Sequence, residues 1–405
     1  MLVELNLFDS KKDYYIFFGI FVIILLFNIA LKYHTFQDIK SHKIYTTTAT
    51  VINQYQKTKH NKTYTVFKLH SKDGFIFYTT SKEDLKDLYG DKLLLKMLTK
   101  NIRFLDMFKG FYAPAFDFRL IEKDRIKKEI LNKISRQHKE PMLKELFQAL
   151  FLAKPISKEL RDKVSNLGIS HLIAISGFHL GVLFFILYFL LEKVYIFFQN
   201  RYFPYRNRQF DLTIMIMFLL FGYLYLLGFV PSLVRSYVML IVGFFLYDRF
   251  YKIISFEVLF VAVLLILAFI PEFFFSVGFW FSVSGVFFIY YYLYFFSKLK
   301  PLYVVLTLNV FVYLAMLPVV HFVFDKFTYL QLLSPLLSIL FILFYPLELF
   351  LHMIGYGGLL DSWIMELLNL KTTSFHIKTP FLFLVVYFVS FFFFYKIYSK
   401  HREKY

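Results

Sequence analysis

The chain of 405 residues is 58% hydrophobic and 22% aromatic, and its apolar residues form long runs separated by short charged segments. This pattern excludes an ordinary soluble protein and indicates an integral membrane protein. Cysteine is absent, which excludes disulfides, thiol nucleophiles and thiolate metal ligands without deciding the compartment.

The net charge of +18 is unevenly distributed, since residues 32–165 hold 28 Lys and Arg against 15 Asp and Glu, an excess of 13. A basic segment beside a membrane favours a polyanionic partner, either nucleic acid or anionic lipid headgroups. The alternative is a solvated, lysine-rich surface, and charge alone does not separate the two interpretations.

The first apolar run, Tyr14–Leu31, contains no charged residue and follows Lys11 and Lys12. It is long enough to cross a bilayer, and no small-x-small cleavage pattern follows it, which favours an anchor over a cleaved signal peptide. We therefore expect residues 1–31 to contain the first transmembrane helix, with its start on the cytoplasmic side.

The pattern changes in residues 32–120, where short β-rich runs are separated by turn signals such as Asp73-Gly74. One run alternates between two faces, with Tyr64, Val66 and Lys68 against Thr65, Phe67 and Leu69. These runs predict a soluble domain with a small antiparallel barrel or meander, and about five such strands favour a small β-barrel of the OB type.

Lysines and tyrosines are interleaved around the predicted connection between the first two strands, Gln56–Lys62. On such a barrel, cations that hold phosphates and rings that stack on bases bind single-stranded nucleic acid. The predicted DNA-binding residues are Tyr55, Lys57, Lys59, His60, Lys62, Tyr64 and Lys68. The alternative is an exposed hairpin whose lysines only keep the domain soluble.

Residues 121–165 are strongly charged and follow a helical pattern. The apolar positions of the expected amphipathic helix are Leu143, Leu146, Phe147, Leu150 and Phe151. We expect this stripe either to lie on the membrane surface or to dock on the helix bundle, with Lys139, Lys144 and Lys154 toward lipid headgroups. Pro155 ends the segment.

Residues 166–398 are predicted to form a polytopic transmembrane domain, followed by a basic cytoplasmic tail at residues 399–405. After an apolar run to about Phe198, the predicted spans are Phe210–Phe229, Leu233–Tyr247, Phe256–Ile270, Phe274–Phe296, Leu302–Val320, Leu330–Met353 and Phe381–Ile397. If the β-rich domain lies outside, the cytoplasmic loops carry Arg201, Arg206, Arg208, Arg249, Lys252, Lys298 and Lys300, as the positive-inside rule requires.

The basic tail reaches the cytoplasm only if one of these segments does not cross the membrane. Leu330–Met353 contains Pro335, Pro346 and Glu348. We predict that it forms a re-entrant pair of broken helices, because irregular backbone is tolerated at membrane depth where protein or water surrounds it. Thr372 is then expected on the outer side.

The most unusual membrane segment is Leu167–Val182, which carries two histidines, two serines and three glycines. Polar residues in such a run tend to mark function. If the segment is one helix, Ala174, Gly177 and Gly181 share a face, and the G-x-x-x-G spacing predicts close packing of another helix there.

The polar side chains His171, Ser176 and His179 fall on another face of that helix, which favours a hydrated path. The alternative is that the serine bonds its own helix backbone while the histidines lie at the membrane edge. Hydrolysis by Ser176 is disfavoured, because a base on the same helix rarely approaches a nucleophile closely enough. We expect no enzyme activity, no metal, for which no third ligand is present, and no cofactor.

Arg235 lies in a short apolar segment just after Pro231. A charge at that depth needs a partner, water or an anion. Its guanidinium is suited to bidentate contact with a phosphate. The alternative is an ion pair with Glu257 or Glu272 that fixes helix packing.

Four motifs follow in order: His171-Leu-Ile-Ala-Ile-Ser176-Gly177-Phe-His179, Pro231-Ser-Leu-Val-Arg235, Gly278-Phe-Trp-Phe-Ser282, and Pro318 with His321-Phe322. In order and spacing they resemble the ComEC family of competence proteins, the inner-membrane DNA channels of natural transformation. The first motif is the specific one, and matches that family's H-L-hydrophobic-A-hydrophobic-S-G-hydrophobic-H. The resemblance covers roughly Leu146–Met353, with an N-terminal segment similar in pattern to the family's OB-like domain.

Three features depart from the family pattern. Ser236 stands where alanine is usual, and Trp280 stands where glutamine is usual. Many members also carry a C-terminal metallo-β-lactamase-like domain, and this sequence has no His-x-His-x-Asp-His motif. We therefore expect another protein to degrade any second strand.

The resemblance implies that single-stranded DNA passes from the outer face of the bacterial inner membrane to the cytoplasm. The predicted pore residues are His171, Ser176, Gly177, His179, Gly181, Ser232, Arg235 and Ser282. No nucleotide-binding loop is present, so a cytoplasmic motor helicase or the membrane potential should supply the driving force. Further expected partners are a periplasmic DNA receptor, membrane lipid and a second copy of the chain. The alternative function is a transporter for a small or lipid-linked solute.

Overall fold

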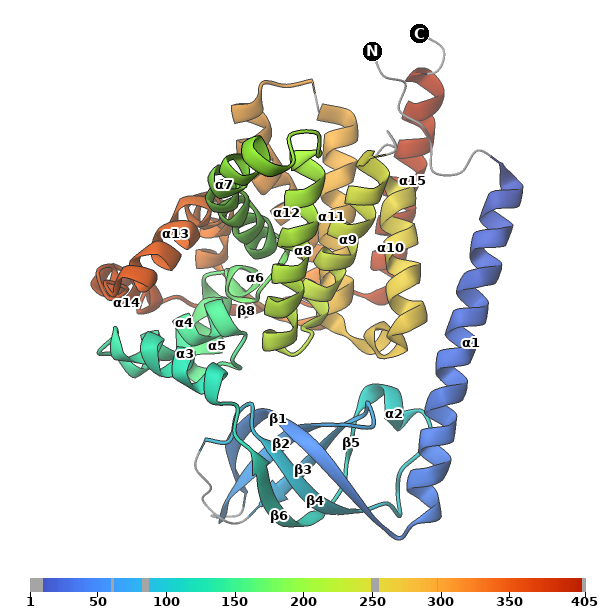
Figure 1. The fold of residues 1–405 in the computed structure, drawn as a ribbon, viewed down its shortest axis with the longest axis vertical. Coiled ribbons are helices and arrows are strands. Elements are labelled where there is room, and N and C mark those ends of the chain that lie inside the picture. The colour runs from blue at the N-terminus through green and yellow to red at the C-terminus, as the bar shows by residue number, and fades with distance from the viewer. Residues whose placement is uncertain (1–9, 60–61, 82–86, 249–254, 297, 403–405) are drawn as a thin grey trace.

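The computed structural model describes residues 10–59, 62–81, 87–248, 255–296 and 298–402. Figure 1 shows a bundle of helices with a six-stranded sheet at one end. The first helix begins, and the last helix ends, at the end of the bundle away from the sheet. The chain thus has the β-rich and the helical part that the sequence predicts.

Helices account for most of the chain. Their bounds are α1 (Lys11–Ser41), α2 (Asp106–Lys109), α3 (Arg125–Arg136), α4 (Pro141–Leu152), α5 (Lys158–Asn166), α6 (Ser170–Ile173), α7 (Gly177–Tyr202), α8 (Arg208–Leu227), α9 (Pro231–Asp248), α10 (Phe256–Phe269), α11 (Val277–Phe296), α12 (Pro301–Val323), α13 (Ser334–Ile354), α14 (Asp361–Leu368) and α15 (Phe381–Arg402), with the 3₁₀ helices η1 (Pro271–Phe275) and η2 (Tyr329–Leu333).

Six of these elements in the described part of the chain are long and apolar enough to cross a membrane: α1, α7, α8, α11, α12 and the run that η2 forms with α13. The shorter helices α9, α10 and α15 are also apolar. This set fits the predicted polytopic helical membrane protein.

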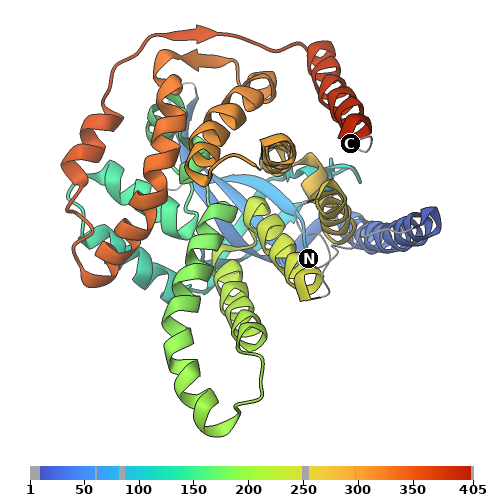
Figure 2. The ribbon, with the colours of Figure 1, turned by 90° about the horizontal axis from the view of Figure 1, so that it is seen from above.

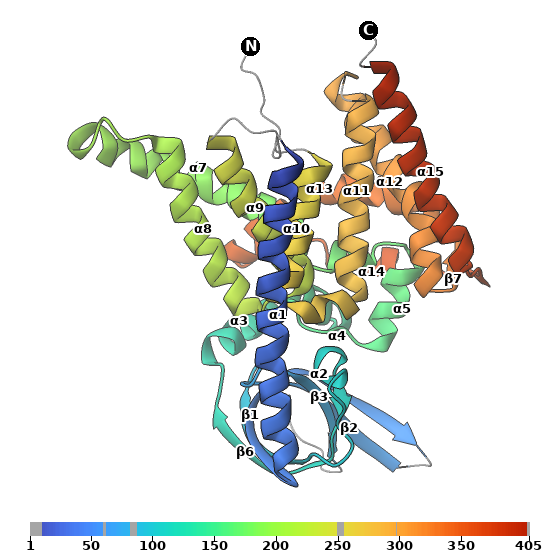
Figure 3. The ribbon, with the colours of Figure 1, turned by 90° about the vertical axis from the view of Figure 1, so that its right-hand side faces the viewer.

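Helix α1 is longer than the predicted span and joins the two parts of the molecule. Its middle packs beside α10, where the Asn28 side chain donates a hydrogen bond to the Ala268 carbonyl at 3.0 Å. Its last turns place Phe36 and Ile39 in the core of the sheet. The helix therefore continues from the bundle into the sheet domain without a linker (Figure 3).

The sheet consists of β1 (Ile44–Lys59), β2 (Lys62–Ser71), β3 (Ile76–Ser81), β4 (Lys92–Leu98), β5 (Phe111–Tyr112) and β6 (Ala115–Glu122). Its order is β5-β3-β2-β1-β4-β6, and only the β3–β5 pair is parallel. Thr65, Phe67 and Leu69 are buried, as the predicted alternation along β2 requires, but Val66 of the opposite face is also buried, at 6% exposed, so the alternation is only partly confirmed.

The predicted closed barrel is wrong, because the hydrogen-bonded order has two ends, β5 and β6. The chain changes partner between these strands. The Ala113 N–H donates to the Tyr78 carbonyl of β3 at 2.9 Å, whereas the Pro114 carbonyl accepts from Leu98 of β4 at 2.9 Å. Proline has no N–H to continue the ladder, so the strand is interrupted at that point.

The charged segment after the sheet folds into α3, α4 and α5, as its helical pattern predicts. On α4, Phe147 and Leu150 are 0% and 1% exposed and share a core with Tyr345 of α13. The apolar stripe of α4 therefore docks on the helix bundle, which is one of the two predicted arrangements. Lys154 does not point to lipid headgroups, because its ammonium lies 2.6 Å from Asp87 of the sheet domain.

Strands β7 (Lys326–Thr328) and β8 (Ser374–His376) pair antiparallel and hold both ends of residues 329–373 together, toward the end of the bundle that faces the sheet domain (Figures 1 and 2). The chain therefore returns to the end of the bundle where this segment starts, as the re-entrant prediction requires. The predicted break is wrong, because α13 is continuous: Pro335 stands in its first turn, where no N–H is needed, and Pro346 is accommodated inside it.

Candidate functional site

The segment predicted as one helix from Leu167 is two helices. Helix α6 ends at Ile173, and α7 begins at Gly177, with Ser176 as its extended N-cap at φ −132° and ψ −178°. The break removes the shared faces on which the predicted groupings depended. It also places the start of α7 within the bundle.

Ser176 and His179 form the cap of α7. The Ser176 N–H donates to His179 Nδ1 at 3.1 Å, and the Ser176 hydroxyl lies 3.2 Å from the same nitrogen. The prediction that one helix keeps these residues apart is wrong, because a side chain in the third helical position reaches back to its N-cap. Since Nδ1 accepts the backbone proton, the neutral ring carries its hydrogen on Nε2.

His179 is fully buried, and its Nε2 has no hydrogen-bond partner among the described residues. Two rings of α13 enclose it, with Tyr345 at 4.4 Å and Phe341 at 5.6 Å between ring centroids. Among the described residues no third group orients the imidazole of His179, so the geometry of the Ser176–His179 pair is that of a cap rather than of an activated nucleophile.

Helix α9 packs against the break. The Ser232 hydroxyl donates to the Ile175 carbonyl at 2.6 Å. A Cβ added at Gly177 would lie only 2.7 Å from the Ser236 hydroxyl oxygen, so glycine is what lets the two helices approach. At Gly181 a Cβ would meet nothing within 4 Å, which contradicts the predicted close contact at that glycine.

Arg235 lies beside this contact and is 5% exposed. Its Nε donates to the Ser282 hydroxyl of α11 at 2.8 Å, and its Nη2 donates to the Ser236 hydroxyl at 3.1 Å. Ser236, which departs from the family pattern, therefore takes part in holding the guanidinium.

Within the described ranges, no carboxylate lies within ion-pair distance of Arg235. Glu257 accepts instead from Tyr14 at 3.0 Å, and Glu272 pairs with Lys32. The predicted alternative of an ion pair between Arg235 and either glutamate is therefore wrong.

His171 lies on α6, away from His179, and is exposed. Its Nε2 is 3.2 Å from the Ser338 hydroxyl of α13. A neighbouring serine on α13, Ser334, donates to the Gly168 carbonyl at 2.9 Å. The sequence analysis missed the α13 face, although its spacing of i, i+4, i+7 and i+11 was visible in Ser334, Ser338, Phe341 and Tyr345.

The predicted DNA-binding residues lie on the β1–β2 hairpin, which projects from the sheet domain in Figure 3. The ammonium of Lys57 lies 5.6 Å from the ring centroid of Tyr55, and that of Lys68 lies 5.8 Å from Tyr78 of β3. Lys57 is opposite Tyr64, and Lys59 is opposite Lys62 in the strand register. His60 lies outside the described residues.

Of the other motif residues, His321 is 6% exposed at the end of α12 and lines a recess of about 480 Å³ with Pro318 and Phe327. Its carbonyl accepts from the Thr379 N–H at 3.0 Å, which ties α12 to the segment before α15. Trp280 donates its indole N–H to the Phe274 carbonyl at 2.8 Å and thereby fixes η1 to α11.

The structure thus brings together Ser176, Gly177, His179, Ser232, Arg235 and Ser282 at the contact of α7, α9 and α11, and leaves His171 and Gly181 apart from it. A family model described as Competence protein matches residues 153–402, which include this contact and leave out the N-terminal sheet. No curated protein and no solved structure matches the chain.

Proposed function

The chain belongs to the competence protein family, and on that premise we propose that it passes single-stranded DNA through the bacterial inner membrane during natural transformation. Family membership supports a role in DNA uptake. That the DNA is single-stranded, that it moves into the cytoplasm and that this chain forms the channel are parts of the proposal.

The observation that carries the proposal is the environment of Arg235. A buried guanidinium held by neutral hydroxyls, without a carboxylate among the described residues, keeps its positive charge uncompensated. A phosphate that passes the α7–α9–α11 contact would supply the missing negative charge through charge-assisted hydrogen bonds. This preference for a passing anion is what a DNA path requires, because a bare phosphate in hydrocarbon is prohibitive.

The hairpin of β1 and β2 would receive the strand. Lys57 and Lys68 are placed beside aromatic rings, so that phosphate contacts and base stacking are available on one surface. In this proposal the sheet domain faces the outside, and the loops with Arg201, Arg206 and Lys298 face the cytoplasm.

The proposal assigns no catalysis to the chain. A periplasmic receptor would deliver the strand, a cytoplasmic motor helicase or the membrane potential would draw it inward, and another protein would degrade the second strand. Membrane lipid surrounds the bundle, and a second copy of the chain would complete any pore that forms between chains.

The test compares Arg235→Gln, Arg235→Lys and Arg206→Gln in transformation of cells whose periplasm already holds the DNA. Arg206 is a matched control, since it is exposed and pairs with Asp211 at 2.5 Å outside the contact. We expect Arg235→Gln to lower transformation roughly tenfold or more, because charge-assisted phosphate bonds are lost. Arg235→Lys should retain part of the activity and Arg206→Gln nearly all of it.

Protein abundance is measured by immunoblot, so that misfolding is not scored as loss of function. Normal transformation by a strain without the gene would refute the proposal and favour a transporter for a small or lipid-linked solute. Equal loss in Arg206→Gln and Arg235→Gln would remove the special role of Arg235.

A further inference from the structure

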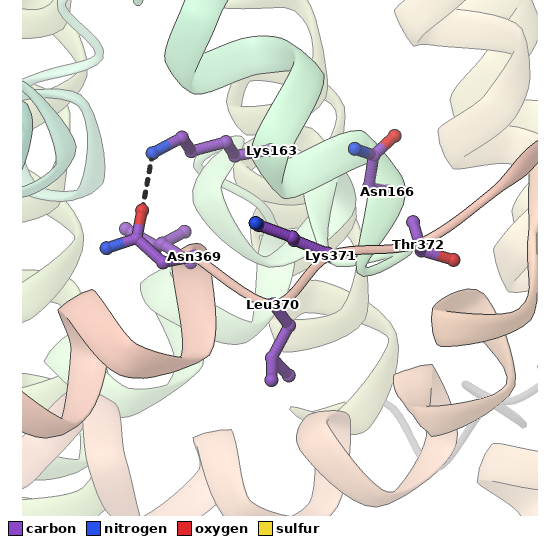
Figure 4. A pocket seen from close by; sticks show the side chains of 7 residues that line it. Lys163, Asn166, Asn369, Leu370, Lys371 and Thr372 are labelled. Atoms are coloured by element: carbon purple, nitrogen blue, oxygen red, sulfur yellow. Dashed lines mark hydrogen bonds between the residues drawn. The ribbon is translucent and has the colours of Figure 1, made fainter.

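A polar recess of about 440 Å³ lies between the end of α5 and the chain that leads from α14 to β8 (Figure 4). Lys163 and Asn166 line it from α5, and Asn369, Lys371 and Thr372 line it from the other side. Among the described residues that line it, none is acidic. Helix α5 and strand β8, between which the recess lies, are at the end of the bundle that faces the sheet domain (Figure 1).

Two ammonium groups give the recess its charge. Lys163 donates to the Asn369 side-chain oxygen at 2.7 Å, and its one carboxylate neighbour, Glu159, is 3.8 Å away and largely exposed. Such an exposed pair compensates little charge. Lys371 makes no ion pair or hydrogen bond within the described ranges, so its charge is uncompensated.

Asn166 adds a neutral donor. Its side-chain oxygen is buried without a partner among the described residues, while Figure 4 shows its amide nitrogen turned toward Lys371. The recess therefore presents the ammonium groups of Lys163 and Lys371 and the amide of Asn166 from facing sides. Lys163 already donates to Asn369, whereas the Lys371 ammonium is a donor without a partner among the described residues, and an anion with several acceptor oxygens can accept from it and from the amide N–H.

The end of α5 would oppose an anion if its last carbonyls were free, because a helix C-terminus carries partial negative charge. Those carbonyls are occupied. The Gln331 side chain donates to the Ser165 carbonyl at 3.1 Å, and the Thr328 hydroxyl donates to that of Asn166. Because these carbonyls are already hydrogen-bonded, Lys163 and Lys371 determine the sign of the electrostatic potential in the recess.

We propose that this recess binds a phosphodiester group of the incoming single strand, between the hairpin of the sheet domain and the bundle. The proposal rests on the function proposed above for the nature of the strand. A phosphodiester fits because it is an anion that only accepts hydrogen bonds, and the recess has room for one phosphate with part of its sugar. In this proposal Lys163 and Lys371 contact the phosphate from opposite sides, and Asn166 contacts it between them.

The test measures binding of a fluorescent single-stranded oligonucleotide to the full chain in nanodiscs of zwitterionic lipid. We expect the double variant Lys163→Gln/Lys371→Gln to bind about tenfold more weakly, because two charge-assisted contacts are lost. The slope of log affinity against log salt concentration should become less steep by about 0.7, because the protein neutralises one phosphate fewer. The matched control is Lys158→Gln, an exposed lysine of the same helix that does not line the recess.

The single variant Lys371→Gln removes no hydrogen bond or ion pair among the described residues, so we expect it to fold normally and its weaker binding to report the lost charge. If the wild type and the double variant bind the oligonucleotide equally well, the recess is overturned while the channel proposal stands. If neither binds it, both proposals fail. If the double variant loses only bound anionic lipid, measured by native mass spectrometry, the anion is a lipid headgroup and the proposal is likewise overturned.

Discussion

At the scale of single residues, a buried row of polar side chains joins the connection between α3 and α4 to α13 and α14. His138 Nδ1 lies 2.8 Å from Asp361, and its Nε2 lies 2.9 Å from His352 Nε2. His352 in turn faces the buried Glu348 at 3.2 Å, and Phe147 stacks on the ring of His138. The row fastens the segment after the sheet domain to α13 and α14.

This row predicts a stability that depends on pH. Burial lowers the pKa of His138 below its ordinary value, against the smaller opposing effect of Asp361. The unfolded chain therefore binds more protons than the folded chain below about pH 6.5, so stability falls as the pH falls through that range. Thermal unfolding at pH 7.5 and pH 5.5 should show a lower midpoint in acid.

The control for this prediction is His138→Gln, which keeps a donor for Asp361 but does not titrate. Its unfolding midpoint should change less between the two pH values than that of the wild type. An identical pH dependence in both proteins would mean that other groups are responsible.

The contact of α7 and α9 gives a second prediction at this scale. Gly177→Ala places a methyl group against the Ser236 hydroxyl and should destabilise the protein by about 1–3 kcal/mol through overpacking. Gly181→Ala, where space is open, should be neutral or slightly stabilising. Thermal unfolding of the two variants in the same detergent distinguishes them.

A double variant that also lacks the Ser236 hydroxyl tests whether this contact is the cause. In Gly177→Ala/Ser236→Ala the hydroxyl is gone, and part of the lost stability should return. No recovery would place the cause elsewhere than in the α7–α9 contact.

The sequence indicated most residues of the α7–α9–α11 contact, but it did not indicate how they are arranged. Arg235, Ser176 and Gly177 were recognised because charge, hydroxyl and glycine are rare in an apolar run. Their partners were not predictable, since hydrogen bonds such as Arg235 to Ser282 join helices whose relative rotation the sequence does not specify. The break at Ser176 was missed because a histidine replaces the usual Glu or Gln of a capping box.

At the scale of elements, the β7–β8 pair decides where residues 329–373 return. The pairing predicts that Thr372 lies on the same side of the membrane as the sheet domain. Because the chain has no cysteine, single substitutions can be labelled without background. Thr372→Cys and Lys57→Cys should react with a membrane-impermeant maleimide from one side of the membrane, and Tyr205→Cys from the other.

Tyr205 suits this comparison because it is fully exposed between α7 and α8, at the end of the bundle away from the sheet. Labelling of Thr372→Cys together with Tyr205→Cys would show that α13 crosses the membrane. The arrangement of β7 and β8 would then be wrong.

The elements themselves were largely predictable, because apolar runs and alternating strands are local signals. The sheet shows the limit of local signals. The alternation in β2 identified the buried Thr65, Phe67 and Leu69 but not the burial of Val66 on the other face, and nothing local indicated that the chain changes partner at Pro114. That choice depends on β3 and β4, which are distant in sequence. For the same reason the apolar stripe of α4 was visible, while its docking against α13 was not.

At the scale of the whole molecule, the division into a β-rich and a helical part followed from composition, as did the membrane class. The connection between the parts did not, because an apolar run has no feature that marks where a helix leaves the membrane. Lys32 could have ended the first helix, yet it pairs with Glu272 and the helix continues.

The length of α1 has a mechanical consequence. A helix of 31 residues is about 46 Å long, which exceeds the roughly 30 Å of the hydrocarbon core by several turns. The sheet domain is therefore connected to the bundle by a continuous, rigid helix, which restricts its position more than a flexible linker would. A strand held by the hairpin would be presented to the bundle at a fixed reach, and its effective concentration there would depend on geometry rather than on the entropy of a linker.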